Sequence, residues 1–273
     1  MDILGYPHRG YYAKDSNIGK VRLKPGGVGR NIAEQLALAG AATYLLTAMG
    51  NDSFAQTLQA SCTELGIDLS LALRFNDPSP IYLAVHDAQG DMTAAVNDMD
   101  LLNSMTPEVL SGQVRDMPTM DAAVLDANIP QESIEYFLSQ ASCPVLDDPV
   151  SLEKAMRLMP VLSKLYAIKP NRIEAEALTG EANPERAAQK LLDMGVKQVY
   201  ISMGAEGVWF ADMNQSGHIP SIQLVPSSLT GAGDAMCAGL TMALAKGMDA
   251  AACAMEGVRS ATKYLKIQAQ EME

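Results

Sequence analysis

The stretch LTGAGDAMCAGL, residues 229–240, places three glycines and one acidic residue where a helix is predicted to begin. A Gly-x-Gly turn ahead of a helix lets several backbone N–H groups point at one spot, and the helix dipole adds partial positive charge there. Gly231, Ala232 and Gly233 therefore predict a binding site for an anion. Asp234 would repel a resting anion, but beside a phosphoryl group it can take the proton of an attacking hydroxyl. The alternative is that Asp234 only stabilises the helix N-terminus.

A second glycine-rich stretch, PGGVGRN at residues 25–31, precedes another predicted helix. Gly26 and Gly27 permit close approach of the backbone to a ligand, and Asn31 can both donate and accept hydrogen bonds, which suits a vicinal diol. Dinucleotide binding is the competing interpretation. It is disfavoured because the stretch follows a polar alternating segment instead of a buried strand and lacks the G-x-G-x-x-G spacing.

Two further loops carry polar groups near predicted strand ends. In KPNRIEAEAL, Asn171 and Glu174 have the spacing of a capping box, and Glu174 could also orient a hydrated Mg²⁺ ion. In SMGAEGVWF, Gly204 and Gly207 predict either a tight hairpin or a place where the Ser202 hydroxyl and backbone amides contact a nucleotide.

These loops must be positioned by an alternation of strands and helices. Short apolar segments predict strands, and segments with apolar residues at helical spacing, bounded by Asn, Asp or Gly, predict helices. The predicted helices cover residues 26–40, 51–66, 130–141, 151–159 and 184–194, and the predicted strands cover residues 43–49, 122–127, 144–148, 164–169 and 198–203. This order predicts an α/β fold with a doubly wound sheet, in which ligands bind beyond the carboxyl ends of the strands.

Two regions break this alternation. Residues 6–25 and 81–98 alternate between apolar and polar residues without helices, and the second region reads as a β-hairpin around DAQGD. These strands predict a small sheet packed beside the α/β core. Such a sheet often serves as a lid over an active site.

The composition limits the class of protein. A chain of 273 residues with 48% hydrophobic residues can form one large globular domain. A net charge of −12 argues against a nucleic-acid partner, which would require basic patches. No apolar run of about 18 residues predicts a membrane span, and the first residues do not resemble a signal peptide. The four cysteines and three histidines are scattered, so we expect neither a zinc site nor a Ser–His–Asp triad, and a reducing cytoplasm as the compartment.

Taken together, these stretches resemble a known family. GGVGRNIAEQLALAG and LTGAGDAMCAGL are similar to the two signature regions of the ribokinase-like, PfkB-type sugar and nucleoside kinases. KPNRIEAEALTG matches the family's N-x-x-E motif, and SMGAEGV matches its nucleotide-binding strand. Within the family, DSNIGKVRLKPGGVGRN and AVNDMDLL look most like the pseudouridine kinases. The resemblance covers nearly the whole chain and implies one domain over residues 1–273, a three-layer ribokinase-like core with a mostly parallel central sheet and a small β-sheet lid.

The resemblance also implies roles for individual residues. Asp234 would deprotonate the 5′-hydroxyl of the sugar, beside an anion hole for the transferring phosphoryl group formed by Gly231, Ala232 and Gly233. ATP and Mg²⁺ are the implied cofactors, with ATP contacted by Asn171, Ser202, Gly204 and Gly207 and Mg²⁺ held through water by Glu174. The substrate would be held at the ribose by Asp2, Gly27, Asn31 and Asn128, and at the base by lid residues near Asn17 and Asn97.

Three departures from the family pattern stand out. The family opens with a full strand before the acid that matches Asp2, and the helix after Lys266 looks short, so we expect the chain to be truncated or incompletely represented. A missing central strand would leave the edges of neighbouring strands unpaired. In many relatives an acid six residues before the catalytic aspartate helps a monovalent-cation site. Ser228 stands at that position here, so activation by potassium is an open question.

The sequence thus predicts an ATP-dependent kinase that phosphorylates the 5′-hydroxyl of a ribonucleoside, with pseudouridine as the first choice. The same chemistry on inosine, guanosine or a free sugar is one alternative, and a non-catalytic nucleoside-binding protein is another. The intact Asp234, Glu174 and Asn31 argue against a pure binder, which has no need for a base. The resemblance further implies a homodimer formed through the lid, and neither a membrane nor a nucleic-acid partner is expected.

Overall fold

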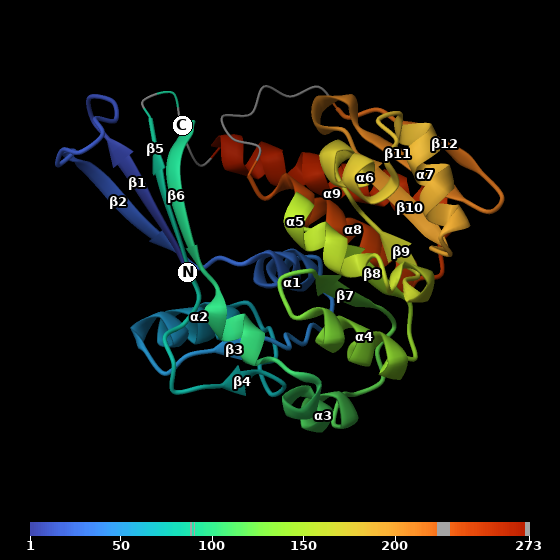
Figure 1. The fold of residues 1–273 in the computed structure, drawn as a ribbon, viewed down its shortest axis with the longest axis horizontal. Helices are drawn as coiled ribbons and strands as arrows, with labels where there is room; N and C mark the ends of the chain where they lie inside the picture. Colours follow the sequence, from blue (N-terminus) through green and yellow to red (C-terminus); the bar gives the residue numbers. More distant parts are fainter. Residues whose placement is uncertain (88, 90, 223–229, 271–273) are drawn as a thin grey trace.

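The computed structural model describes residues 1–87, 89, 91–222 and 230–270. It arranges them as an α/β core with a small upright sheet beside it, and the N-terminus lies at the base of that sheet (Figure 1). Ser228, the residue in question for the cation site, lies outside the described residues.

The central sheet has six strands in the order β12-β11-β10-β9-β8-β7 (Figure 1). Their bounds are Ala123–Asp126 for β7, Val145–Asp148 for β8, Ala167–Ile168 for β9, Gln198–Ser202 for β10, Val208–Asp212 for β11 and Ser216–Ile219 for β12. Strands β7 to β10 pair in parallel, and β11 and β12 extend the sheet in antiparallel fashion. The predicted mostly parallel sheet is confirmed, so the carboxyl ends of four strands meet at one edge.

Helices cover both faces of this sheet because successive strand residues point to opposite sides. Val145 packs in the cluster on one face, and Leu146 packs in the cluster on the other. The Leu146 face is covered by α1 (Val28–Leu38), α8 (Ala232–Ala245) and α9 (Ala250–Gln270). The Val145 face is covered by α3 (Pro107–Arg115), α4 (Gln131–Gln140), α5 (Leu152–Ala155), α6 (Arg172–Thr179) and α7 (Pro184–Asp193). The three layers predicted from the sequence are therefore confirmed.

The small sheet beside the core, which we call the lid, has the strand order β2-β1-β5-β6. Its strands are β1 (Asp2–Pro7), β2 (Gly19–Lys24), β5 (Ile81–His86) and β6 (Met92–Asp98). The hairpin predicted over 81–98 is present, although residues 88 and 90 of its turn lie outside the described part of the chain. The first region differs from the predicted 6–25, because β1 already begins at Asp2, where it pairs with β5, and residues 8–18 form the connection to β2.

The predicted strand over 43–49 was wrong for most of its length. Only Ala48–Met49 forms a strand, β3, which pairs in parallel with β4 (Leu73–Arg74) in a separate two-stranded sheet. In the described ranges, β7 pairs with β8 and with no strand on its other edge. Earlier in the segment Tyr44 forms an isolated parallel bridge with Asp68, so the backbone pairing is interrupted before it resumes alongside β4.

Other predicted bounds shift at irregular backbone. The helix predicted over 151–159 splits into α5 and a 3-10 turn ahead of Pro160. The 3-10 turns cover Asp100–Ser104, Met156–Leu158, Leu162–Lys164 and Gly204–Glu206. The helix predicted over 51–66 is confirmed as α2 (Ser53–Glu64), where the Asp52 carboxylate caps the start by accepting from Ala55 N at 2.8 Å. Among the helices in the described ranges, none is long and apolar enough to cross a membrane.

Candidate active site

Polar side chains meet where the carboxyl ends of β7, β8 and β9 face the N-termini of α1 and α8. Asp126 ends β7, and its Oδ2 accepts a hydrogen bond from Gly29 N at 2.9 Å, in the first turn of α1. Asp148 ends β8, and its Oδ2 accepts a hydrogen bond from Cys237 Sγ at 3.2 Å, on α8. Lys169 follows β9 directly. The carboxyl edge of the sheet thus gathers charged groups on its α1–α8 side, as expected for a ligand site in such a fold.

Asp234 lies in the first turn of α8 and is held by α1. Asn31 Nδ2 donates a hydrogen bond to Asp234 Oδ2 at 2.9 Å. Burial raises the pKa of Asp234 to about 6, an increase that the Asn31 hydrogen bond and the Lys169 ammonium oppose and Asp148 supports. A carboxylate with this pKa is ionised at neutral pH and still basic enough to accept a proton from a reacting hydroxyl.

Gly231 gives α8 its unusual start. It occupies the left-handed region with φ at 86°, and no side chain caps the helix. A Cβ at this position would come within 2.4 Å of the hydroxyl oxygen of Tyr264, which packs from α9. In the described part of the chain, no acceptor is bonded to the N–H groups of Ala232, Gly233 and Asp234. These donors, together with the dipole of a helix that spans Ala232–Ala245, are suited to an anion.

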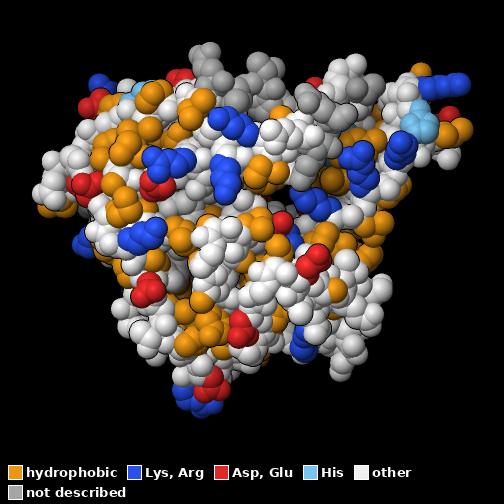
Figure 2. Space-filling view, turned by 180° about the vertical axis from the view of Figure 1, so that it is seen from behind, with side chains coloured by type: hydrophobic (Ala, Val, Ile, Leu, Met, Phe, Trp, Pro, Cys, Tyr) orange, Lys and Arg blue, Asp and Glu red, His pale blue; other side chains and the backbone are white. Residues whose placement is uncertain are grey.

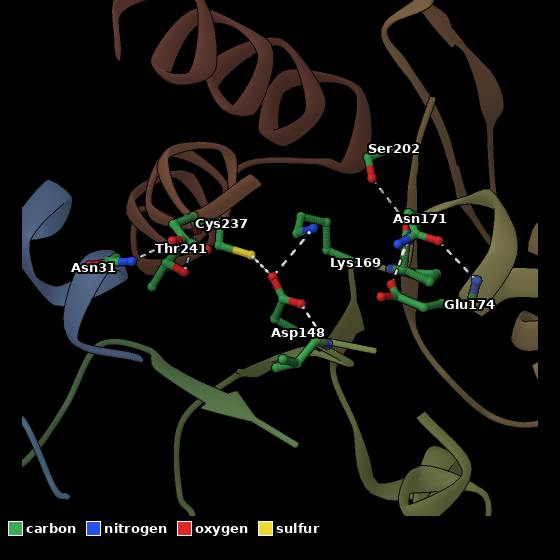
Figure 3. A network of polar contacts seen from close by, with 11 residues as sticks. Asn31, Asp148, Lys169, Asn171, Glu174, Ser202, Cys237 and Thr241 are labelled. Atoms are coloured by element: carbon green, nitrogen blue, oxygen red, sulfur yellow. Dashed lines mark hydrogen bonds and ion pairs between the residues drawn. The ribbon is translucent and has the colours of Figure 1, made fainter. Parts of the chain in front are cut away.

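Lys169, Asp148 and Cys237 form a buried network next to Asp234 (Figure 3). Lys169 Nζ lies 3.3 Å from Asp148 Oδ2, and both side chains are almost fully buried. Burial alone would lower the pKa of Lys169, but the neighbouring carboxylates, led by Asp148, raise it above its ordinary value. The ammonium group is therefore charged at every physiological pH.

Sequence reasoning missed Lys169 and Asp148 as site residues. A signal was present, since charged residues interrupt the otherwise apolar strand ends in PVLDD and KLYAIK. A charge at the end of a buried parallel strand is unusual unless a partner or a ligand meets it there.

Asn171 and Glu174 make the complete capping box at the start of α6. Glu174 N donates to Asn171 Oδ1 at 2.9 Å, and Asn171 N donates to Glu174 Oε2 at 2.8 Å. Ser202 lies alongside, its hydroxyl donating to Pro170 O at 3.3 Å (Figure 3). The structural role of this pair is thus fully formed. Glu174 remains a candidate metal-binding residue. Burial and, to a lesser extent, Asp148 raise its pKa, and a nearby cation would lower that pKa again by stabilising the ionised carboxylate.

The glycines after β10 have different surroundings. Gly204 has φ at 60°, and a Cβ there would meet no atom within 4 Å. Gly207 has φ at 99°, and a Cβ there would come within 2.1 Å of Ile219 O. The close approach of Ile219 therefore requires glycine at position 207. No atom lies near the position of a Cβ at Gly204, so the backbone of the turn is accessible there.

The acidic side chains at this edge of the sheet are better suited to hold a cation through its water ligands than to bind it directly. Over the described residues, no three His, Cys, Asp or Glu side chains lie close enough together to hold a metal ion by themselves. Burial is the main cause that raises the pKa of Asp147, and Asp148, Asp126 and Glu174 raise it further, which indicates an excess of negative charge at this edge. Mg²⁺ suits such a site because it keeps several water ligands and is commonly completed by substrate phosphates.

The lid contributes Asp2 on the face turned toward the core. A Cβ at Gly26 would lie 2.1 Å from Asp2 Oδ1, so only glycine leaves room for the carboxylate. Strand pairing puts Asp2 in one row across the lid with Lys24, Tyr82 and Asn97. Figure 2 shows the molecule hollowed between the lid, on the right, and the core, with Lys and Arg side chains gathered beside the hollow.

Two predicted substrate residues have structural partners instead. Asn17 closes the connection between β1 and β2, accepting from Tyr12 N at 2.7 Å and donating to Tyr12 O at 2.9 Å, at the opposite end of β1 from Asp2. Asn128 Oδ1 accepts a hydrogen bond from Lys154 Nζ. The other predicted residues at the ribose site, Asp2, Gly27 and Asn31, lie around the start of α1.

Comparison with known proteins is consistent with this geometry. The pfkB family carbohydrate kinase profile matches residues 1–267. The pseudouridine kinase of Escherichia coli K12 is 36% identical over 256 residues, covering 91% of this chain and 82% of that protein. The ribokinase structure from Thermotoga maritima has a TM-score of 0.89 at 23% identity, covering 99% of this chain and 91% of that one. An E. coli ribokinase II structure in complex with ATP and Mg²⁺ has a TM-score of 0.83 at 17% identity, covering 97% and 89%.

Proposed function

The chain belongs to the pfkB family of carbohydrate kinases and is a phosphotransferase, and from this we propose that it transfers the γ-phosphoryl group of ATP to the 5′-hydroxyl of a ribonucleoside. Pseudouridine is the proposed substrate. One observation carries the proposal: the Asp234 carboxylate, oriented by Asn31 at 2.9 Å, lies beside the N–H groups that begin α8, for which the described part of the chain supplies no acceptor. A hydroxyl and a phosphoryl group placed there would be next to a base and an anion site at once.

In the proposed mechanism Asp234 accepts the proton of the 5′-hydroxyl. The hydroxyl oxygen forms a bond to the γ-phosphorus, the bond between that phosphorus and the bridging oxygen breaks, and ADP leaves. The N–H groups of Ala232, Gly233 and Asp234 are suited to stabilise the negative charge on the phosphoryl oxygens during transfer. Catalysis by positioning and electrostatics of this kind is typical of phosphoryl transfer.

ATP and Mg²⁺ fit the polar groups at the sheet edge. Bound Mg²⁺ would offset the charge of the phosphates, and Glu174 would hold it through water beside Asn171. Ser202 and the open turn at Gly204 would contact ATP, and we include Gly207 as the residue that fixes this turn against β12. An E. coli protein with the same fold was solved with ATP and Mg²⁺, which supports this choice of ligands.

The proposed ribonucleoside lies between α1 and the lid. Asp2 and Asn31 would hold the ribose hydroxyls above the Gly26–Gly27 backbone. Asn97, in the same row of the lid as Asp2, would contact the base, and we retain Asn17 and Asn128 only as residues that shape the surrounding loops. The similarity to a protein named pseudouridine kinase supports pseudouridine over other nucleosides.

A coupled assay of ADP release tests the proposal. Purified protein is supplied with ATP, Mg²⁺ and one of pseudouridine, uridine, inosine, guanosine or ribose, in potassium and in sodium salts. We expect the highest kcat/KM with pseudouridine and a loss of about 10³-fold or more in kcat for Asp234→Asn, with ATP affinity retained. Turnover by Asp234→Asn close to that of the parent would refute the base, and tight nucleoside binding without turnover would favour a binding protein.

We further propose that two copies associate through the outer face of the lid. Residues facing away from the core alternate with the Asp2 row, and Asp98, which pairs with Ile81, is the charged residue at one end of this face; the next residues along the strands are apolar or glycine. They form two rows across the four strands, Leu23–Ile3–Leu83–Val96 and Val21–Gly5–Val85–Ala94. Val21 is 66% exposed and Val96 is 65% exposed, an apolar surface of the kind that marks association.

All four cysteines are unpaired, which agrees with the proposed cytoplasmic location.

A further inference from the structure

We propose that the face of the lid turned toward the core holds a second anion site, formed by Lys20, Arg22 and Lys24, which we call the basic strip. The site takes the polyphosphate chain of a nucleotide and, when filled, excludes the nucleoside. It is separate from the phosphoryl site at the start of α8. The exclusion of the nucleoside rests on the proposed function, whereas the anion site itself does not.

Strand pairing places the basic strip on one face of β2. Lys24 pairs with Asp2, the lid residue next to the core, and Arg22 and Lys20 follow at alternate positions of β2. Because alternate residues of a strand point to the same side, the three basic side chains share the face of Asp2. Successive members lie about 7 Å apart along the strand, and Lys20 lies about 13 Å beyond the row of Asp2. The basic strip therefore leads from the nucleoside site away from the core.

Little negative charge balances the basic strip. Over the described residues, none of its three members forms an ion pair with a carboxylate. Asp2 is the acid that the four strands place on this face, since Asp98 pairs with Ile81 on the other face. In a chain with a net charge of −12, three cations gathered beside one acid indicate a site for an anionic ligand. Figure 2 shows Lys and Arg side chains beside the hollow between lid and core.

Arg22 is held in position by an aromatic stack. Its guanidinium carbon lies 5.5 Å from the centroid of the Tyr6 ring. That ring stacks on His86, with the two centroids 5.1 Å apart and the ring planes at 14°. A guanidinium group placed over a ring keeps its N–H donors available for paired hydrogen bonds to phosphate oxygens. Arg22 thus offers an oriented pair of donors at the middle of the basic strip, with a lysine on either side.

Neither proposed substrate accounts for the basic strip. A ribonucleoside carries no charge on its hydroxyls, and Asp2, Asn31 and Asn97 already supply hydrogen-bonding groups for it in the proposed function. The phosphates of the reacting ATP would lie at the start of α8, on the core. A polyphosphate chain spreads several negative charges along its length, which suits cations that follow one another along a strand.

Protection of the sheet edge explains these residues less completely. β2 is an edge strand of the lid, and lysines on edge strands discourage pairing with another chain. That role requires charge on the strand but no particular face. The basic residues of β2 nevertheless all share one face, and Val21 and Leu23 lie on the other. Edge protection also gives no reason for the stacking of Arg22 on Tyr6.

The imidazole signals of His86 in NMR spectra report on this site without any turnover. The chain has three histidines, and the variant His86→Gln identifies which signals belong to His86. Inorganic triphosphate, ATP and adenosine are titrated separately, without Mg²⁺ and at low ionic strength. We expect the His86 signals to shift saturably with triphosphate and with ATP and to stay in place with adenosine. We also expect triphosphate to raise the Kd of pseudouridine.

The double variant Lys20→Gln, Arg22→Gln removes two positive charges and keeps polar side chains. We expect its affinity for triphosphate, followed at His86, to fall about tenfold or more. Triphosphate should then no longer raise the Kd of pseudouridine. The matched control is Lys197→Gln, Lys246→Gln, at two exposed sites: Lys197 precedes β10 at the amino edge of the sheet, and Lys246 ends α8. The control should keep the parent's affinity.

Three results would overturn the site. Equal losses in the two double variants would show that net charge alone attracts the anion. His86 signals that triphosphate leaves in place, or that adenosine shifts as much as ATP does, would show that no phosphate is recognised there. A shift with triphosphate but none with ATP would overturn the assignment to a nucleotide. Failure of the parent protein to release ADP with any nucleoside would instead refute the proposed function and leave the triphosphate titrations valid.

Discussion

The pKa of Asp234, the proposed base, is set by side chains from four elements. Burial raises the pKa of Asp234 to about 6, Asn31 on α1 and Lys169 after β9 oppose the rise, and Asp148 on β8 and Asp126 on β7 add to it. The balance leaves a carboxylate that is ionised at neutral pH and yet a stronger base than one in water. A small change in any of these neighbours should therefore be visible in the pH dependence of catalysis.

We expect kcat to lose about tenfold per pH unit below about pH 6, because the proton that binds Asp234 blocks its role as base. Asn31→Leu removes a hydrogen bond that lowers the pKa of Asp234, so its acid limb should move to higher pH. Measuring kcat at saturating ATP and nucleoside from pH 4.5 to 8.5 tests both statements. An acid limb that stays in place in Asn31→Leu would show that another group controls the pH dependence.

Asp147 presents the opposite case, a carboxyl group without a partner. It is completely buried, neither of its oxygens has a hydrogen-bond partner among the residues that the structure describes, and Asp148, Asp126 and Glu174 act on its charge. Burial and these carboxylates raise its pKa well above the ordinary value. The folded protein therefore holds a proton on Asp147 that the unfolded chain releases at lower pH.

This difference predicts a pH-dependent stability. The contribution of protonated Asp147 is fully present below its unfolded pKa, near 3.9, and is lost as the pH rises through the higher folded pKa. Asp147→Asn removes the ionisation, so its Tm relative to the parent should increase between pH 5 and pH 8. Asp121→Asn, at an exposed site, is the control and should show no such trend. A constant difference in Tm across this range would exclude the raised pKa.

At the scale of elements, capping residues and turns made the helices predictable. Asp52 and Asn171 each cap a helix where the sequence offers a polar residue before an apolar repeat. Strands of two residues, such as β3 and β9, were not predictable, because their extent depends on which neighbour supplies backbone partners. Long-range pairing of this kind leaves no local pattern in the sequence.

The candidate site was predictable in part for a similar reason. Glycine-rich helix starts have a recognisable local spacing. Asp234 and Asn31 were predicted as site residues because each lies next to such a stretch. Lys169 and Asp148 belong to different strands and meet only through the parallel order of the sheet. Asn17 was predicted to lie near the base because the resemblance places its segment in the lid, and the hydrogen bonds that it makes with Tyr12 depend on the loop conformation.

The contact between α8 and α9 gives a prediction about packing. A Cβ at Gly239 would come within 2.6 Å of Glu256 O and within 2.5 Å of Ser260 Oγ, so Gly239→Ala forces the two helices apart. We expect a loss of about 1–3 kcal/mol in the free energy of unfolding. Gly112, in the middle of α3, has no atom within 4 Å of a built Cβ, so Gly112→Ala should stabilise by about 0.5–1 kcal/mol.

Urea unfolding of both variants measures these changes under one set of conditions. If both substitutions changed the free energy of unfolding equally, helix propensity alone would determine their effects. The close approach of α8 and α9 would then not be maintained in solution.

At the scale of the whole molecule, the lid presents one polar and one apolar face. The polar face carries Asp2 and Asn97 toward the core, and the apolar face carries Leu23 and Val96 away from it. Successive side chains of a strand point to opposite faces of the sheet, and strands that pair in register keep each set of side chains on one face, which separates the polar from the apolar residues. In the proposed function, one small sheet would thus contact the substrate with one face and a second copy of the chain with the other.

The proposed dimer should dissociate when charge is placed on the apolar face. We expect a mass of twice 29.1 kDa for the parent in sedimentation and a mass of 29.1 kDa for the double variant Leu23→Lys, Val96→Lys. Val109→Lys, on the exposed side of α3, is the control and should keep the parent's mass. A parent that sediments as a monomer at high micromolar concentration would refute association through the lid.

The free cysteines described above have a practical consequence. Cys62 is buried where α2 packs against α1, Cys253 is buried in the α8–α9 layer, and Cys143 is partly exposed. A buried thiol reacts with an alkylating reagent only when the structure around it opens, so the rate of modification reports the free energy of that opening. In variants that keep a single thiol, the rates of alkylation at Cys62 and at Cys253 would report separately how often each region opens, and no new cysteine has to be introduced.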